Sequence, residues 1–298
     1  MKKLALLGFA ILVGVAAFAG TGFVLLTERL GPVAAEPVPL DGARPFRSWP
    51  EHDAIYLLGQ FPYIVEHETD RGAVLYFGAK HSSDPADPQF ERMREAWDRF
   101  APTVALNEGR ARYFRFFAES MNGVSDPAVV YALARRDGIP IFSLEPEYED
   151  EVAALLTEWP ADVVACYVVL RVVAAESGGD PSRAEKIAPA LIRKRTDVDG
   201  LRGSINTVQD LDLVWATVAP DGPDWRTLNN TETTERLRAV GDASREIRGR
   251  HMVRAIATLV GQGERVFAVV GASHVIRHEP TLQDLLGTRS VTPHEIGK

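Results

Sequence analysis

The sequence predicts an α/β protein with a mostly parallel sheet and helices on both of its faces. Four short runs are apolar, β-prone and rich in branched and aromatic residues, as strands buried on both faces are. They are residues 73–81, 102–109, 138–146 and 266–274. Amphipathic helical stretches at 88–100 and 126–137 separate the first three. This alternation is typical of parallel βαβ units with right-handed crossovers.

The first and last of these runs both stop at the sequence Gly-Ala-x-His. The first run delivers His81 and the last delivers His274. A glycine lets the backbone turn sharply and come close to whatever binds there. Because ligands of open α/β sheets lie in the crevice at the carboxyl ends of the strands, two imidazoles at such ends indicate a site.

The two middle runs end in carboxylates, Glu108 in one and Glu145 in the other. We therefore expect four strand ends to direct two histidines and two glutamates to one edge of the sheet. Imidazole and carboxylate are ligands of zinc, manganese and cobalt, and they are also the commonest general acids and bases. A single histidine in such a place is usually structural, and a single carboxylate often caps the next helix. It is the group of four that points to function.

These motifs resemble those of the TraB/PrgY/GumN and Tiki family, over roughly residues 55–290. The resemblance rests on the first Gly-x-x-His, the glutamate that ends a second strand, and the C-terminal Gly-Ala-x-His preceded by a helix with arginine and methionine. In that helix Arg248 stands four residues before Met252, and Arg250 is the alternative in a shifted register. The wider superfamily includes the ChaN-like haem-binding proteins and the erythromycin esterases.

The resemblance implies a ChaN/EreA-like α/β fold and a hydrolase of peptide or protein substrates that needs a divalent metal, namely manganese, cobalt or zinc. It implies that the four strand-end residues bind the metal. Glu108 would also act as the base, and Arg248 would stabilise the oxyanion. Arg250 would support the site from behind the ligands. His278 is expected to do the same or to serve as a further ligand, because it follows the second motif closely. The alternative from the same superfamily is a module that binds haem or a signalling peptide without chemistry.

The first 26 residues are predicted to be a membrane anchor or a signal peptide. Lys2 and Lys3 precede an uncharged, mostly apolar stretch of 23 residues that ends at Leu26, and a helix of about 20 residues is enough to cross a bilayer. We expect an uncleaved, single-pass anchor with the N-terminus in the cytoplasm and the rest of the chain outside it. Cleavage after Ala19, which would give a secreted or periplasmic protein, is the alternative.

The rest of the chain is expected to consist of a Pro-rich linker, residues 27–50, and one α/β domain, residues 51–298. Between residues 149 and 241 the pattern is mostly helical, which predicts helical cover for the sheet. Cys166 lies in an apolar run of this region, so we expect a buried and inert thiol.

The composition excludes several classes of function. A formal net charge of −8 without a basic patch argues against nucleic acid as a partner. A single cysteine excludes an intramolecular disulfide and a zinc site with several cysteines. The chain has no G-x-S-x-G elbow, phosphate loop or dinucleotide fingerprint, which disfavours serine-hydrolase and nucleotide-dependent chemistry.

Overall fold

The structure, a computed structural model, describes residues 27–33, 39–82, 84–109, 112–114, 125–229 and 235–287. The predicted anchor or signal segment, residues 1–26, lies outside the described residues. Within them, no helix is both long enough and apolar enough to cross a membrane.

The chain folds into two compact units. The first, here called the α/β unit, comprises Met1–Glu145 and His251–Lys298. The second, here called the helical unit, comprises Pro146–Arg250.

A five-stranded sheet forms the centre of the α/β unit. Its strands are β2 (Tyr63–Glu68), β3 (Ala73–Ala79), β4 (Val104–Asn107), β6 (Ile141–Ser143) and β7 (Arg265–Gly271). They lie in the order β2-β3-β7-β4-β6, and the four strands predicted from the sequence are parallel to one another. The predicted α/β class and mostly parallel sheet are therefore confirmed. β2, which the sequence analysis did not identify, runs antiparallel to β3 and makes the sheet mixed.

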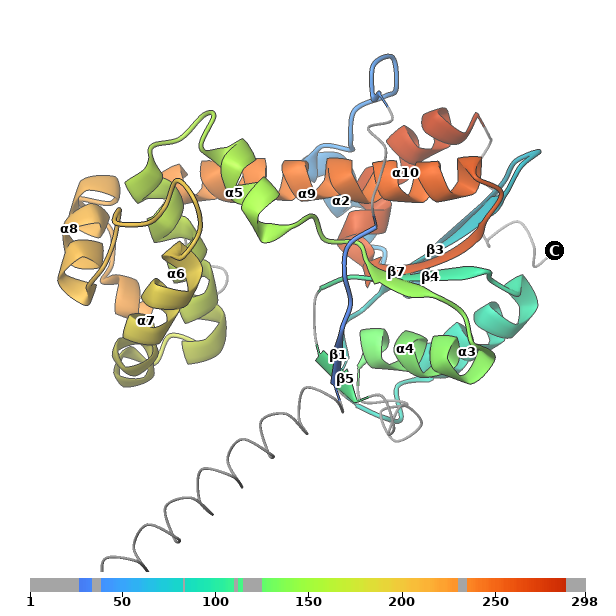
Figure 1. Ribbon diagram of the computed structural model, residues 1–298, viewed down its shortest axis with the longest axis horizontal. Helices are drawn as coiled ribbons and strands as arrows, with labels where there is room; N and C mark the ends of the chain where they lie inside the picture. Colours follow the sequence, from blue (N-terminus) through green and yellow to red (C-terminus); the bar gives the residue numbers. More distant parts are fainter. Residues whose placement is uncertain are drawn as a thin grey trace, which may run out of the picture. The chain divides into compact units, whose positions relative to one another are not determined.

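Helices cover both faces of this sheet. α3 (Pro88–Phe100) and α4 (Asp126–Asp137) have the predicted bounds and lie on one side, and α10 (Ala272–Leu286) lies on the other (Figure 1). Along β7, Phe267 and Val269 pack with α3 and α4, whereas Val266, Ala268 and Val270 pack with α10 and the end of α9 (Glu235–Gly261). Because both sides of the strand meet apolar helices, its sequence is continuously apolar rather than alternating.

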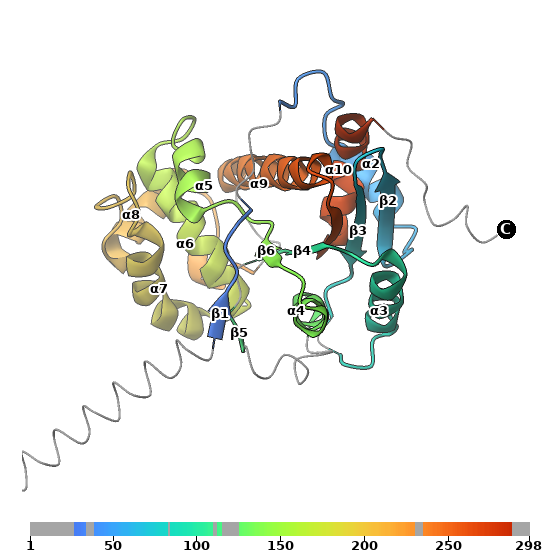
Figure 2. The same ribbon diagram turned by 45° about the vertical axis from the view of Figure 1, so that its right-hand side comes forward.

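The described parts of residues 27–50 pack against the α/β unit. They include the strand β1 (Thr27–Arg29) and the start of the helix α2 (Trp49–Tyr56). β1 pairs with the short strand β5 (Arg112–Phe114), as Figure 2 shows. The Arg44 guanidinium forms an ion pair of 2.7 Å with Asp284, and Arg47 forms one of 2.8 Å with Glu279, both on α10. This part of the predicted linker is thereby fixed to α10.

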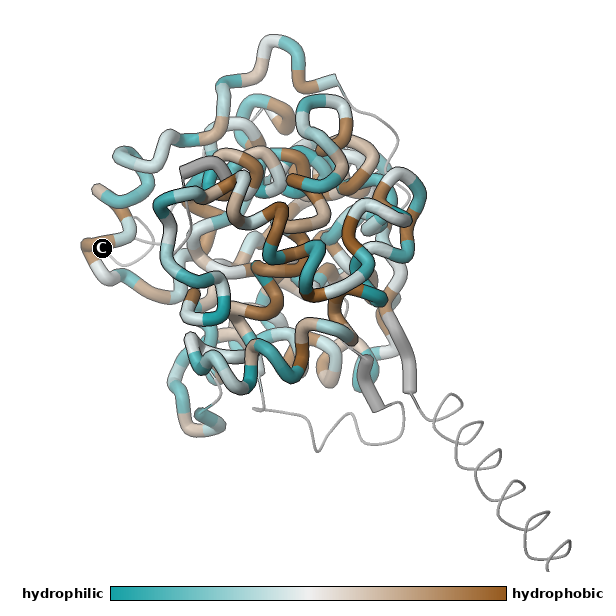
Figure 3. The backbone as a smooth tube through the Cα atoms, turned by 90° about the vertical axis from the view of Figure 1, so that its left-hand side faces the viewer, coloured by the Kyte–Doolittle hydropathy of each residue, from teal (hydrophilic) through white to brown (hydrophobic). Residues whose placement is uncertain are grey.

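The region between residues 149 and 241 is helical, as predicted, and has a hydrophobic core of its own. Its elements are α5 (Tyr148–Leu155), α6 (Ala161–Ser177), α7 (Pro181–Thr196), α8 (Val208–Val218), the 3-10 helix η2 (Trp225–Thr227) and the first part of α9. Brown and teal segments alternate along the helices in Figure 3, as expected of helices that bury one side. Cys166 is fully buried, and burial raises the pKa of its thiol to about 12, as expected for an inert cysteine.

Candidate functional site

The carboxyl ends of the four parallel strands meet at one edge of the sheet, where the predicted residues lie. His81 comes two residues after β3, Glu108 directly follows β4, and Glu145 comes two residues after β6. His274 is placed differently from the prediction, because β7 ends at Gly271 and α10 begins at once. His274 is therefore the third residue of that helix rather than a strand end.

The Glu108 carboxylate lies between the two histidines. One oxygen, Oε2, is 3.8 Å from Nε2 of His81, and the other, Oε1, is 3.4 Å from Nε2 of His274. Oε2 also accepts a hydrogen bond of 2.7 Å from the backbone N–H of Gly271, which is the N-cap of α10. Because the N-terminus of a helix carries partial positive charge, this position stabilises the carboxylate anion. Glu108 is thus held in place by α10 and faces both imidazoles.

A buried carboxylate orients the ring of His81. Nδ1 of His81 is 3.0 Å from Oδ2 of Asp126, whose side chain is only 2% exposed. The hydrogen bond to Asp126 is the main cause that raises the pKa of His81 above its ordinary value. The side chain of Gln89 bonds both the N–H and the C=O of Lys80, which fixes the backbone beside His81. With Nδ1 engaged, Nε2 is the ring nitrogen that faces Glu108.

Asp126 is the member of the site that the sequence analysis missed. It follows Ser125 and precedes Pro127 at the start of α4, a pattern that usually means only a helix N-terminus. Its remaining oxygen, Oδ1, is buried and has no hydrogen-bond partner among the residues that the structure describes. Buried polar atoms left in this state are uncommon and occur often at functional sites. An acidic first turn was the one available signal, and it does not reveal a partner 45 residues away.

His278, predicted to support the site, lies behind His274. The centres of the two rings are 5.3 Å apart, and Nδ1 of His278 is 3.0 Å from the hydroxyl of Tyr76. Both His278 and Tyr76 are buried. Burial raises the pKa of Tyr76 well above its ordinary value, and the charges of Glu108 and Glu145 raise it further. Glu145 therefore lies close enough for its charge to act on Tyr76, as the charge of Glu108 does.

The two glycines of the Gly-Ala-x-His motifs make room for each other's segment. A Cβ atom added at Gly78 would lie 2.9 Å from the Cα of Ala272, at the start of the helix that carries His274. A Cβ atom added at Gly271 would lie 2.8 Å from Nε2 of His81. Neither position tolerates a side chain without a shift of its neighbours. The motif glycines therefore allow the two histidine segments to approach each other.

The two predicted arginines belong to the helical unit. Arg250 forms an ion pair of 3.0 Å with Glu246, one helical turn earlier on α9. The charge of Arg248 acts on Arg171 of α6. The residues around Glu108, namely His81, Asp126 and His274, all belong to the α/β unit.

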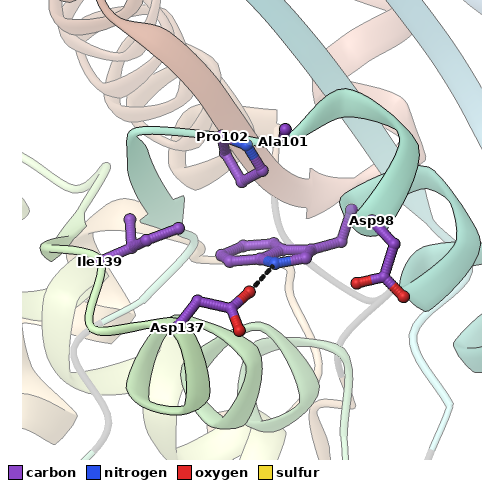
Figure 4. A pocket seen from close by; sticks show the side chains of 6 residues that line it. Asp98, Ala101, Pro102, Asp137 and Ile139 are labelled. Atoms are coloured by element: carbon purple, nitrogen blue, oxygen red, sulfur yellow. Dashed lines mark hydrogen bonds between the residues drawn. The ribbon is translucent and has the colours of Figure 1, made fainter.

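A surface hollow of about 290 Å³ lies elsewhere in the α/β unit (Figure 4). Its lining comes from the C-terminal ends of α3 and α4 and from the residues just before β4 and β6, at the edge of the sheet opposite the histidines. The Trp97 indole N–H donates to Asp137 at 2.7 Å, and Arg136 pairs with both Asp137 and Asp98. The hollow is separate from the candidate site because it lies at the amino ends of the parallel strands, whereas the histidines lie at their carboxyl ends.

The donors around Glu108 have the chemistry of a cation site. Two ligands on one tetrahedral zinc ion, each about 2.1 Å from it, are roughly 3.4 Å apart. The two distances from Glu108 to the imidazoles, 3.4 and 3.8 Å, are near this value and longer than a normal hydrogen bond. Among the described residues, however, no three His, Cys, Asp or Glu side chains already surround a single cation position. Side-chain movements would be needed to bring these donors to a common ion.

Comparisons with protein-family models, with curated proteins and with solved structures gave no match. The interpretation of the site therefore depends on its own geometry and on the motif resemblance.

Proposed function

We propose that this chain is a metal-dependent hydrolase of peptide bonds, similar in its site to the TraB/PrgY/GumN and Tiki family. The observation that carries the proposal is the position of Glu108, which faces Nε2 of both His81 and His274. A carboxylate between two imidazoles, one of them oriented by a buried aspartate, suits either metal binding or proton transfer.

His81, His274 and Glu108 are the residues that would hold a divalent ion, with Glu145 as a fourth donor from the same edge. The pairing of His81 with Asp126 supports this assignment, because histidines that bind metals usually donate their other ring N–H to a carboxylate or carbonyl. Manganese, cobalt and zinc all accept this set of nitrogen and oxygen donors. When bound, such an ion lowers the pKa of its water from about 15.7 towards 7 and polarises a carbonyl group.

The residues of the chain have separate parts in the proposed reaction. Glu108 takes the proton of the attacking water, since its carboxylate is held by the Gly271 N–H and faces the centre of the site. Asp126 fixes the tautomer of His81 with the proton on Nδ1. Tyr76 and His278, hydrogen-bonded to each other behind His274, fill the space there and limit the movement of that ring.

The reaction is proposed to take place outside the cytoplasm, on a domain anchored by residues 1–26. Alkaline phosphatase fused after Leu40 should then be active in a bacterial host, because that enzyme works only after export. A stable but inactive fusion contradicts this topology.

Substitution of Glu108 tests the proposed reaction. The purified protein should cleave unstructured peptides only when manganese, cobalt or zinc is supplied, and a chelator should abolish cleavage reversibly. Glu108→Gln should reduce turnover by about 100-fold or more, since an amide cannot accept the proton. The fold should be retained, because the amide oxygen can still accept the Gly271 N–H. Peptide cleavage and thermal unfolding are the two measurements.

Glu91→Gln is the matched control. Glu91 lies on α3, where its exposed side chain pairs only locally with Arg94, so this variant should keep full turnover. Binding of haem with a visible absorption band, together with no metal-dependent cleavage, would refute the hydrolase and leave the binding module as the function.

A further inference from the structure

A second group of charged residues lies within the helical unit, away from the residues discussed so far. Its side chains come from four helices. They are Tyr148 and Glu151 on α5, Tyr167 and Arg171 on α6, Arg195 on α7, and Ser244 on α9. The Glu151 carboxylate is almost completely buried, accepts a hydrogen bond of 2.6 Å from Ser244 and is 3.2 Å from Nη1 of Arg171. Nη1 of Arg171 also lies 3.4 Å from the hydroxyl groups of Tyr167 and Ser244. Arg171 is thus well partnered, whereas Arg195 is not.

Arg195 is a half-buried cation that makes no ion pair at contact distance among the described residues, although the charge of Glu151 acts on it from further away. Its Nε is buried and makes no hydrogen bond, and no ion pair of this side chain occurs among the described residues. The guanidinium lies over the ring of Tyr148, 4.7 Å from the ring centre, and the Tyr148 hydroxyl donates to the backbone C=O of Arg195. Burial is the main cause that lowers the pKa of Arg195, and the charge of Arg171 lowers it further. A partly buried charge in this state is unfavourable unless something else pairs with it.

Arg171, the second arginine of the group, also lies over a tyrosine ring and is partly exposed. The Arg171 guanidinium lies 5.6 Å from the ring centre of Tyr167, and its side chain keeps 29% of its exposure. The charge of Arg248 adds to the positive potential at Arg171. Two planar guanidinium groups, both resting on tyrosine rings, thus face one buried carboxylate. Guanidinium groups bind carboxylate and phosphate oxygens through pairs of parallel hydrogen bonds, and their interaction strengthens where water is partly excluded.

We propose that Arg195 and Arg171 form a binding site for a small oxyanion, either the carboxylate or the phosphate group of a ligand. The oxyanion accepts hydrogen bonds from the guanidinium of Arg195 and supplies a negative charge within hydrogen-bond distance of it, which no carboxylate among the described residues does. The contacts with the tyrosine rings limit the rotation of the two guanidinium groups, so little side-chain freedom is lost on binding. This site is independent of the proposed hydrolase reaction.

Calorimetry and thermal unfolding of the full-length chain in a non-ionic detergent test the site. Sodium phosphate, sodium acetate and sodium succinate are compared at equal ionic strength with sodium chloride. At least one oxyanion should bind saturably with a Kd below about 1 mM and raise Tm by about 5 °C at saturation, with chloride giving neither effect. Binding of phosphate alone identifies a phosphate ligand, and binding of the acids alone identifies a carboxylate. Equal effects of chloride and all the oxyanions overturn the proposal.

Two variants assign the binding to these residues. Arg195→Met should weaken oxyanion binding at least 10-fold while the protein stays as stable as the wild type without ligand, because an unpaired cation is replaced by an apolar chain. Arg193→Met, which changes an exposed arginine on the same helix, should bind as the wild type does. Unchanged binding in Arg195→Met, or equal weakening in Arg193→Met, refutes the site.

Glu151→Gln gives a test that does not depend on Arg195→Met being folded. Glutamine can still accept the hydrogen bonds of Ser244 and Arg171, but it removes the one negative charge that competes for the arginines. Oxyanion binding should become at least threefold tighter. Weaker binding in this variant would show that the arginines serve only to neutralise Glu151.

Discussion

The two Gly-Ala-x-His segments leave adjacent parallel strands, yet they differ by one residue in register. Ala79 pairs with Gly271, so Gly78 is the last but one residue of β3, whereas Gly271 is the final residue of β7. After β3 the chain continues as a loop, and His81 stands on that loop. After β7 the chain enters α10 directly, and His274 belongs to its first turn.

The histidines consequently have different surroundings. The side chain of His81 is 64% exposed and is oriented by Asp126, whereas that of His274 is 18% exposed and packs beside His278. The first ring is held by a charged hydrogen bond and the second by packing on a helix. The same four-residue motif thus supplies one exposed imidazole that is bonded to a carboxylate and one imidazole that is packed on a helix.

Removing either imidazole should have the largest effect and should show whether the two are equivalent in function. His81→Ala and His274→Ala are each expected to reduce metal-dependent turnover by about 1000-fold or more, because each deletes one of the two nitrogens that face Glu108. The free energy of unfolding should fall by no more than about 2 kcal/mol in either variant. Peptide cleavage and urea denaturation measure the two effects. Full activity in one variant would show that only the other histidine is functional.

The motif glycines should separate stability from function. A Cβ atom at Gly78 would lie 2.7 Å from the backbone O of Tyr63 and 2.9 Å from the Cα of Ala272, and neither atom can move without moving its element. We expect Gly78→Ala to lower the free energy of unfolding by about 2 to 3 kcal/mol. Urea denaturation gives this value.

Gly271→Ala is the matched substitution in the second motif. Its new methyl group would clash with the end of the exposed side chain of His81, which can rotate away, and would lie in ordinary contact, 3.6 Å, with Oε2 of Glu108. The φ angle at this position is −58°, open to any residue. The stability should change by less than about 1 kcal/mol, while turnover falls because His81 is displaced. A loss of stability equal to that of Gly78→Ala would show that the two glycines have the same, purely structural role.

The strands and helices around the site could be predicted from the sequence because they follow local rules. Apolar runs predicted β3, β4, β6 and β7. The bounds of α3 and α4 follow from the proline in the first turn of each helix and from the residue after its end, Gly138 in the case of α4. The strand-end positions of His81, Glu108 and Glu145 then followed from the parallel order.

The remaining features depend on contacts that no local pattern encodes. The β2 strand, at the edge of the sheet, contains His67 and two glutamates and so lacks the continuous apolar run of the buried strands. The pairing of Asp126 with His81 joins the start of one helix to the loop before another. The division into two units has no local signal either, since the helical region has a pattern equally suited to covering a sheet and to forming its own core.

The smallest expected effect concerns Asp126, and it tests why the two histidines differ. In the metal-free protein, Asp126→Asn should lower the pKa of His81, because the hydrogen bond to the carboxylate is the main cause that raises it. NMR titration of the histidine ring protons in the presence of a chelator measures this pKa. Asp84→Asn is the control, since Asp84 lies three residues after His81 but bonds the backbone N–H of Ala86.

The same substitution should change how stability depends on pH. The pKa of His81 is raised in the folded state above its value of about 6.5 in the unfolded chain, so folding favours the protonated ring. The stabilisation by Asp126 is therefore complete below pH 6.5 and is lost as the pH rises through the folded-state pKa. The stability difference between wild type and Asp126→Asn should accordingly be larger at pH 5.5 than at pH 8.5, as urea denaturation at the two values would show. An equal difference at both would mean that Asp126 acts through the start of α4 and not through His81, and the two histidines would then differ in packing alone.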